Sequence, residues 1–417
     1  MKKFVAIILA LVMVLALAAC GQSSAPAATP AESSAPAESS APAESSAPAD
    51  TGAAEPAAAE TAGIKLDGSW PEEKVKIGVI AFDTTDESFM GVMNYFDYLT
   101  KYFNVEFTVS EAIQSAEHEF QFIDSCAAAG CKGIFAYYNV AGAESIKHAM
   151  DQGLCYWGMA EFYEAVKSDP HFVGCYEFAD PNNSGKNGDY LGGYELGYTM
   201  GKAGLNHIAF CNGGASFGVQ MFIDRQQGFF DGIAKAQEEG SATKFDPATD
   251  VIEGFPNDAY FAAQAAFFSA DYDGVVSSFD AFTWFQPIIE SGKDIKVGCI
   301  GTVSDTYKNF VDNGTVIALV YDCPEVVFGS AFADLMNAIT GHNDLCVDKD
   351  GFALKNPTQR WTLNGSEDFN KVYNKHETEG SYFISADEMA SILGAVNENA
   401  TVDDVCAMFN KSLDDVK

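Results

Sequence analysis

The side chains best suited to chemistry are acidic, amide, hydroxyl and aromatic groups that directly follow short apolar runs. They occupy segments 83–88, 137–141, 161–162, 212–217 and 278–282 and position 322. These segments contain few Lys, Arg or His residues. Carboxylates and amides bind hydroxyl groups, and aromatic faces cover apolar surface. The set therefore favours a neutral, hydroxyl-bearing ligand over a phosphate.

One of these segments fits the nucleophile elbow of a serine hydrolase. Residues 214–218 read Gly-Ala-Ser-Phe-Gly, between a predicted strand and a predicted helix, and His342 and His376 follow as candidate bases. A glycine-rich loop that brings backbone close to a ligand explains the same residues, and no HGGG-type oxyanion loop precedes them. We favour the loop, assign no catalytic residue, and keep a hydrolase built on Ser216 as an alternative.

Metal-binding patterns are weak. Segment 348–351 is similar to the middle of a calcium loop, but its outer ligand positions fall on Cys346 and Pro357, so we expect a turn. Segment 180–185 fits better but places Leu191 at the twelfth position, and calcium there stays open. The six histidines include no HxxxH pair, and the sequence contains no CxxC and no Cys/His cluster. We therefore expect no metal and no cofactor.

Ten cysteines are present, and nine remain after Cys20. An odd number cannot pair completely, and several lie in apolar runs such as 154–157 and 297–300, where a free cysteine behaves as a small buried hydrophobe. Whether Cys346 and Cys406 pair is left open by the sequence.

The N-terminus has the pattern of a lipoprotein signal. A basic start precedes the uncharged apolar run 4–16, and residues 17–21 read Leu-Ala-Ala-Cys-Gly, which resembles the bacterial lipobox. We expect residues 1–19 to be a signal peptide and Cys20 to carry lipid, which would anchor the chain at the extracytoplasmic face of the cell membrane. An ordinary signal with an incidental cysteine is the alternative.

Residues 20–69 form a low-complexity tether after the lipidated cysteine. Three copies of Ala-Glu-Ser-Ser-Ala-Pro fill 31–48, inside a longer tract of the same composition. Such a tract cannot form a core. It predicts a spacer that lets a domain stand off the membrane.

The acidity belongs to the body that follows. The chain has 24 Lys and Arg against 59 Asp and Glu, a formal charge of −35, and residues 70–417 contain 21 of the former and 52 of the latter. Such a surface repels phosphate backbones and anionic lipid headgroups. Nucleic acid is excluded as a partner, and membrane attachment is expected through lipid only.

Apolar runs alternate with helical patterns throughout this body. Predicted strands are 75–82, 105–110, 132–138, 154–160, 171–178, 206–212, 250–255, 273–279, 295–302 and 315–321, and predicted helices include 87–103, 116–129, 190–203 and 217–238. Strands that are apolar throughout and separated by helices predict parallel sheets covered on both faces. Ten strands exceed one comfortable sheet, so we expect an α/β fold of two doubly wound lobes.

Two further patterns concern packing. Gly193, Gly197 and Gly201 recur every four residues and predict close packing of their helix against a sheet. Near the C-terminus, capping residues Ser385 and Thr401 each open a helix. We expect these last helices on the exterior of a lobe.

Together the lipobox, the tether and the βα order look like a solute-binding lipoprotein of an ABC importer. The body from about 74 to 341 resembles the type I periplasmic binding fold of ribose- and galactose-binding proteins. The resemblance rests on four segments: the first strand 76–80, the segment 188–193 (similar to D-N-x-x-G-G), the segment 224–229 (similar to R-x-x-G-F), and the closing strands and helices 297–325.

The resemblance implies a hinged receptor that binds one small solute between two lobes. Its ligand-binding residues would be Asp83, Ser88, Phe89, Tyr137 and Glu161 in the first lobe, Asn187, Asp189 and Asp322 at the hinge, and Ser216, Phe217, Ser278 and Asp280 in the second lobe. Two positions depart from the family pattern, because Ile223 and Ile300 stand where a sugar-contacting Arg and Asp are usual. The resemblance thus favours a sugar-like solute that is larger or less polar than a simple pentose or hexose. Arg225 would be structural.

The resemblance also implies a domain plan and partners. Residues 70–187 with about 323–341 would form the N-terminal lobe, 188–322 the C-terminal lobe, and 342–417 an extension packed on the lobes. The protein would act as a monomer and deliver its solute to an ABC permease in the membrane. A sensory receptor of the same fold, signalling to a membrane kinase, is the alternative.

Overall fold

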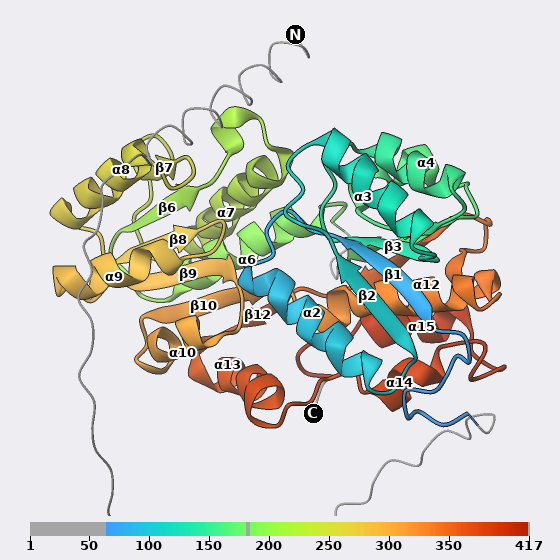
Figure 1. The fold of residues 1–417 in the computed structure, drawn as a ribbon. Helices are drawn as coiled ribbons and strands as arrows, with labels where there is room; N and C mark the ends of the chain where they lie inside the picture. The colour runs from blue at the N-terminus through green and yellow to red at the C-terminus, as the bar shows by residue number, and fades with distance from the viewer. Residues whose placement is uncertain (1–63, 181–183, 416–417) are drawn as a thin grey trace, which may run out of the picture. The chain divides into compact units, whose positions relative to one another are not determined.

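The computed structural model describes residues 64–180 and 184–415. The predicted signal peptide, Cys20 and most of the tether lie outside the described residues. Within the described ranges, none of the helices has the length and apolar character needed to cross a membrane. The description below concerns the body that follows the N-terminal segment (Figure 1).

The N-terminal lobe is built on a six-stranded parallel sheet in the order β11-β5-β4-β3-β1-β2. Its strands are β1 (Val75–Ile80), β2 (Val105–Val109), β3 (Gly133–Ala136), β4 (Cys155–Trp157), β5 (Phe172–Phe178) and β11 (Leu354–Thr358). Its helices are α2 (Glu87–Thr100), α3 (Ala116–Ala128), α4 (Ala143–Asp151), α5 (Tyr163–Val166), α11 (Pro324–Val327) and α12 (Gly329–Ile339). The first five strands and the first two helices confirm the sequence prediction.

The C-terminal lobe has a second sheet in the order β12-β10-β9-β8-β6-β7, parallel except for β12. Its strands are β6 (Ile208–Asn212), β7 (Val251–Glu253), β8 (Gly274–Ser277), β9 (Lys296–Gly301), β10 (Val316–Tyr321) and β12 (Trp361–Leu363). Its helices are α6 (Gly188–Lys202), α7 (Gln220–Glu238), α8 (Asp258–Ser269), α9 (Phe282–Ser291), α10 (Asp305–Asp312) and α13 (Gly365–Tyr373). Two doubly wound lobes are therefore present, as predicted.

The C-terminal segment is woven into both lobes. It supplies β11 to the first sheet and β12 to the second, and it ends in α14 (Ala386–Ser391) and α15 (Val402–Phe409). Both helices open with the predicted caps, Ser385 and Thr401, each in a capping box. Their inner faces are fully buried, because Met389 and Phe409 have no exposed surface. These helices therefore pack on the lobe with one face and complete its core.

The chain passes between the lobes four times. The first crossing joins β5 to α6, the second joins β10 to α11 through Asp322 and Cys323, and the third joins β11 to β12 through residues 359–360. The fourth follows α13, which packs on α10 and β10, and reaches α14, whose first amide (Ala386) donates to Tyr98 Oη on α2. In Figure 1 the orange and red segments accordingly lie beside both sheets.

Helices α6 and α7 pack backbone against backbone. A Cβ added at Gly228 of α7 would lie 2.0 Å from the carbonyl oxygen of Tyr190 on α6, and one at Gly193 of α6 would lie 2.1 Å from the carbonyl oxygen of Arg225. Gly197 also faces α7 backbone, and Gly201 faces the side chains of Ala236 and Ile233 on α7. The glycine repeat therefore serves helix–helix contact, and the expected helix–sheet contact is wrong for these three positions.

A buried carboxyl group holds the centre of the N-terminal lobe. Asp334 on α12 has no exposed surface, and its Oδ2 accepts hydrogen bonds from Trp157 Nε1 at 3.1 Å and Asn356 Nδ2 at 2.6 Å. Its Oδ1 has no hydrogen-bond partner among the described residues. Burial raises the pKa of Asp334 well above its ordinary value, so this carboxyl group is held in its neutral form over a wide pH range.

Candidate ligand-binding site

Large aromatic side chains stand exposed where the strands of both sheets end. In the N-terminal lobe Phe82 follows β1 and Tyr138 follows β3, with ring centroids 4.9 Å apart. In the C-terminal lobe Phe217, Phe255 and Phe282 follow β6, β7 and β8, and 66%, 46% and 57% of their surface is exposed. Ligands of parallel sheets bind beyond the carboxyl ends of the strands, and gathered apolar side chains mark a binding surface. We therefore place the candidate ligand-binding site at these two carboxyl edges.

Three of the predicted first-lobe residues offer polar groups at this edge. Asp83 is exposed, and its Oδ1 accepts hydrogen bonds from the amide and hydroxyl of Thr85. These two bonds lower the pKa of Asp83, which keeps it a carboxylate acceptor. Ser88 is half-buried in the first turn of α2, and Glu161 is exposed in the short helix η1 (Ala160–Phe162).

Phe89 and Tyr137 pack against each other in the N-terminal lobe. Phe89 is only 2% exposed, and its ring meets that of Tyr137 edge-on at 5.2 Å. The Tyr137 hydroxyl donates to Asp86 Oδ2 at 3.4 Å. Phe89 is thus a core residue in this conformation, and the exposed ring nearest the end of β1 is that of Phe82.

The predicted second-lobe residues divide in the same way. Ser216 and Phe217 are exposed in the short helix η2 (Ala215–Phe217). Ser278 is 1% exposed, and its Oγ accepts the Gly213 amide at 3.3 Å. Ser278 therefore shapes the glycine loop from inside, whereas Ser216 and Phe217 lie on its surface.

Asp280 is a half-buried carboxylate at the carboxyl edge of the second lobe. Its Oδ1 caps α9 by accepting the Phe282 amide at 2.9 Å. Burial raises the pKa of Asp280, and the nearby charges of Glu87 and Asp86 act in the same direction. Carboxyl groups from both lobes therefore influence one another here.

A network of four charged residues joins the crossings beside this edge. Arg360, on the third crossing, donates to both carboxylate oxygens of Asp322 on the second, at 2.6 and 3.0 Å. Arg225 donates to Asp189 at 2.8 Å and to the Ser278 carbonyl at 2.8 Å, and Arg360 lies 3.5 Å from the same Asp189 oxygen. Burial alone would raise the pKa of Asp189, but the two guanidinium groups outweigh it and lower the pKa.

This network includes two of the predicted ligand-binding residues, Asp189 and Asp322. Both already have arginine partners. Arg225 is structural, in agreement with the sequence prediction. Arg360 was missed because it follows a short edge strand that the apolar pattern did not predict.

The remaining positions lie at the start of α6, in α7 and in the second sheet. Asn187 caps α6, with its Oδ1 accepting the Tyr190 amide at 2.9 Å, and donates to Asp224 at 2.7 Å. Of the two departures from the family pattern, Ile223 is 37% exposed and Ile300 is 8% exposed. An apolar side chain thus stands exposed in the first turns of α7, close in sequence to Phe217.

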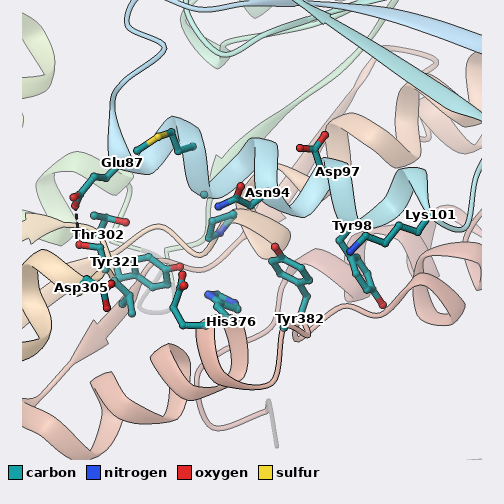
Figure 2. Close-up of a pocket in the computed structure, with 17 residues that line it drawn as sticks. Glu87, Asn94, Asp97, Tyr98, Lys101, Thr302, Asp305, Tyr321, His376 and Tyr382 are labelled. Atoms are coloured by element: carbon teal, nitrogen blue, oxygen red, sulfur yellow. Dashed lines mark hydrogen bonds between the residues drawn. The ribbon is translucent and has the colours of Figure 1, made fainter. Parts of the chain in front are cut away.

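A pocket of about 500 Å³ lies along α2 on the side of the second crossing. Figure 2 shows Tyr321, His376 and Tyr382 on the side of this pocket opposite α2. At one end Glu87 of α2 accepts hydrogen bonds from the hydroxyls of Ser304 and Thr306, both at 2.7 Å. Because α2 and α10 belong to different lobes, these two bonds fasten one lobe to the other.

The Ser216 motif and segment 348–351 do not assemble into sites, and residues 181–183 of the calcium-like segment 180–185 lie outside the described residues. Of the candidate bases for Ser216, His376 is hydrogen-bonded to Glu325, and the ring of His342 packs on Gly394. The segment 348–351 is the expected turn, in which Asp348 accepts the amides of residues 350 and 352. All nine cysteines of the described residues, Cys346 and Cys406 included, are unpaired.

No protein-family model and no curated protein matches the sequence. Solved structures do match. The arabinose-transporter binding protein of Shewanella sp. ANA-3, bound to arabinofuranose, is 19% identical, with a TM-score of 0.53 over 73% of this chain and 97% of that one. A solute-binding protein of Actinobacillus succinogenes 130z with D-allose is 14% identical, with a TM-score of 0.52 over 72% of this chain and 100% of that one. A carbohydrate transporter protein of Acidothermus cellulolyticus 11B with myo-inositol has the same identity and TM-score over 73% of this chain and 99% of that one.

These likenesses establish the fold. The chain has the type I periplasmic binding fold that its sequence predicted, with two parallel-sheet lobes and a multi-strand hinge.

Proposed function

We propose that the chain is the extracytoplasmic solute-binding component of an ABC importer, held at the membrane by lipid on Cys20. It captures one small solute between its lobes and presents it to a permease. In this role the protein makes and breaks no covalent bond. Its work is a difference in affinity between two arrangements of the lobes.

The exposed aromatic rings at the carboxyl edges of both sheets carry this proposal. A solute held between Phe82 and Tyr138 on one side and Phe217, Phe255 and Phe282 on the other would cover surface that water now contacts. At about 25 cal/mol per Å² of apolar area buried, even two such rings contribute several kcal/mol to capture.

The polar groups favour a neutral solute. Asp83, Glu161 and Asp280 offer carboxylate acceptors for hydroxyl groups, while the guanidinium groups of Arg225 and Arg360 already have carboxylate partners. An anionic solute would meet acidic groups with few cations to offset them. The similar solved structures bind arabinofuranose, allose and myo-inositol, which are neutral polyols.

We therefore infer a sugar-like solute that carries an apolar face or an apolar substituent. The ring faces, the exposed Ile223 and the core position of Ile300 agree with a solute less polar than a free pentose or hexose.

A thermal-unfolding screen tests the solute class. The purified chain is heated with free sugars, polyols, aryl and alkyl glycosides, nucleosides and amino acids. A solute at a hundredfold excess over its Kd stabilises the folded chain by about 2.7 kcal/mol. Stabilisation by glycosides or nucleosides above that by amino acids is expected, and silence from every hydroxyl-bearing compound would remove the solute assignment.

The lipid anchor is tested separately. The Cys20→Ser chain, expressed in a bacterial host, should leave the membrane fraction and appear in soluble form, whereas Cys406→Ser should not. Equal membrane retention of both variants would show that the thiol of Cys20 is not the point of attachment.

The sensory alternative shares the fold and the solute. A permease that co-purifies with the crosslinked chain supports transport, and a membrane kinase in its place supports sensing.

A further inference from the structure

A cluster of side chains that can bind a metal ion lies away from the carboxyl edges, where the second and fourth crossings meet. Cys323 follows Asp322 on the second crossing, and Glu325 is the second residue of α11. His376 is part of η4 (Asn374–Thr378), the single π-helical turn on the fourth crossing. One Cys sulfur, one Glu carboxylate oxygen and one His ring nitrogen all lie within 4.8 Å of one another.

The carboxylate of Glu325 is only partly satisfied. Glu325 has no exposed surface, and its Oε1 accepts from His376 Nε2 at 2.8 Å and from the Phe383 amide at 2.9 Å. Its second oxygen, Oε2, has no hydrogen-bond partner among the described residues. A buried carboxylate oxygen without a partner is costly, so each such group calls for an explanation.

A metal ion supplies that explanation. We propose that Cys323, Glu325 and His376 bind a zinc ion. Thiolate, imidazole and carboxylate are the three side chains that zinc prefers, and two ligand atoms on one tetrahedral zinc are roughly 3.3–3.6 Å apart. From a separation of at most 4.8 Å, the ligand atoms need to approach one another by up to about 1.2–1.5 Å to reach that geometry. The Phe383 amide still orients the carboxylate through Oε1 while Oε2 faces the ion.

The protons balance in a simple way. The thiol of Cys323 releases its proton to solvent and becomes a thiolate. The proton on Nε2 of His376 leaves that nitrogen, to solvent from an imidazolium or to Nδ1 of the same ring from a neutral imidazole, so that a neutral ring with Nδ1–H binds the ion. Zinc therefore replaces protons in this cluster, and its affinity falls as the solution becomes more acidic.

Solvent reaches the cluster through the pocket along α2. His376 and Tyr382 line that pocket, with ring centroids 5.2 Å apart, whereas Cys323 and Glu325 are fully buried behind them. Figure 2 shows the His376 ring on the pocket wall below α2. Three protein ligands leave the fourth zinc position for water on the pocket side.

The site ties together two of the four crossings. Cys323 is the residue after Asp322, which is held by Arg360, so zinc fixes the second crossing against the fourth beside the charged network. This proposal does not depend on the solute, and it holds or fails whichever solute the carboxyl edges bind.

Zinc titration of the full chain tests the proposal. The chain is treated with EDTA, freed of chelator and titrated with Zn²⁺ by calorimetry and with Co²⁺ by absorption spectroscopy. One ion per chain is expected, with a thiolate-to-cobalt charge-transfer band. Cys323→Ser should abolish the band, and His376→Ala should weaken zinc binding at least about tenfold.

Two controls separate ligation from folding. Cys406→Ser, which changes a half-buried cysteine outside the cluster, should keep both the stoichiometry and the band. If Cys323→Ser fails to fold, X-ray absorption of the zinc-loaded unchanged chain decides, because one sulfur neighbour at about 2.3 Å is required. A shell of nitrogen and oxygen alone, an intact band in Cys323→Ser, or less than one ion per chain would overturn the site.

Discussion

Arg360 and Asp322 form a two-pronged ion pair between two chain segments that cross from lobe to lobe in opposite directions. Both guanidinium nitrogens that donate are within 3.0 Å of carboxylate oxygens, and the Arg360 side chain is 9% exposed. The same guanidinium stacks on the Phe178 ring, 3.9 Å from its centroid, at the end of β5. One side chain thus contacts three of the four crossings.

Removing this side chain should destabilise the fold. Arg360→Ala removes a positive charge that neutralises the partly buried carboxylates of Asp322 and Asp189. Breaking a buried ion pair costs about 3–5 kcal/mol. Because Asp322 is 31% exposed, we expect the lower end, about 3 kcal/mol, in urea unfolding. The loss of stability in Arg360→Lys should be smaller than in Arg360→Ala, since a lysine keeps the charge but lacks the planar guanidinium that donates to both carboxylate oxygens.

The matched control is Lys296→Ala. Lys296 pairs with the largely exposed Asp294, and a pair of that kind contributes less than about 1 kcal/mol. An Arg360→Ala chain as stable as Lys296→Ala would contradict the role of the network.

The close contact of α6 and α7 should tolerate no methyl group. In Gly228→Ala the new Cβ meets the Tyr190 carbonyl oxygen at 2.0 Å, and backbone cannot yield as a side chain can. We expect a loss of at least about 3 kcal/mol in the free energy of unfolding. Gly91→Ala, also within a helix, meets only Pro324 Cγ at 3.3 Å and should change stability by less than about 1 kcal/mol. Equal effects of the two would refute the packing argument.

Capture of the solute should depend on one end of α9 and not on the other. Phe282 and Ile289 lie on that helix and are 57% and 59% exposed, but Phe282 stands at the carboxyl edge and Ile289 in the last turn. Phe282→Ala should raise the solute Kd about tenfold, because a ring contact contributes 1–2 kcal/mol. Ile289→Ala should leave the Kd unchanged, as calorimetry with the solute from the screen would show.

Asp334 makes stability depend on pH in a direction that can be calculated. Its pKa is raised above 3.8 in the folded chain, so the folded state holds a proton that the unfolded state releases. Stability therefore falls as pH rises from the unfolded pKa toward the folded pKa. Asp334→Asn removes this dependence and keeps an acceptor oxygen for Trp157 and Asn356.

We expect Asp334→Asn to gain stability relative to the unchanged chain between about pH 5 and about pH 7 in urea unfolding. Asp271→Asn, at an exposed position, is the control and should follow the unchanged chain at both values. If the free energy of unfolding changed with pH in the same way in all three chains, Asp334 would be ionised in the folded state.

Most of the fold could be predicted from the sequence because most of its strands are apolar on both faces. Each of the ten predicted runs became a strand, since parallel strands between helix layers have no polar face to interrupt the run. Two of the four edge strands, β11 and β12, were missed because they lack such an apolar run. β11 contains Asn356 and Pro357, and proline is confined to edges or bulges, while β12 has only three residues.

The candidate ligand-binding site could be predicted from the sequence only in part. Loops after strands were located correctly, but which side chains point outward is a tertiary property. Phe82 and Phe89 are both aromatic and seven residues apart, and only the helix geometry of α2 buries the second. The Glu325–His376 contact spans 51 residues, and no spacing rule connects residues that meet through crossings of the hinge.

The way the C-terminal segment completes both sheets fixes when the protein can fold. The first sheet lacks an edge until residues 354–358 arrive, the second lacks one until 361–363, and the core beneath α2 stays open until Phe409 is in place. During synthesis neither lobe can close around a finished core before almost the whole polypeptide has left the ribosome. Both lobes therefore depend on one late segment, and their last strands are added within ten residues of each other.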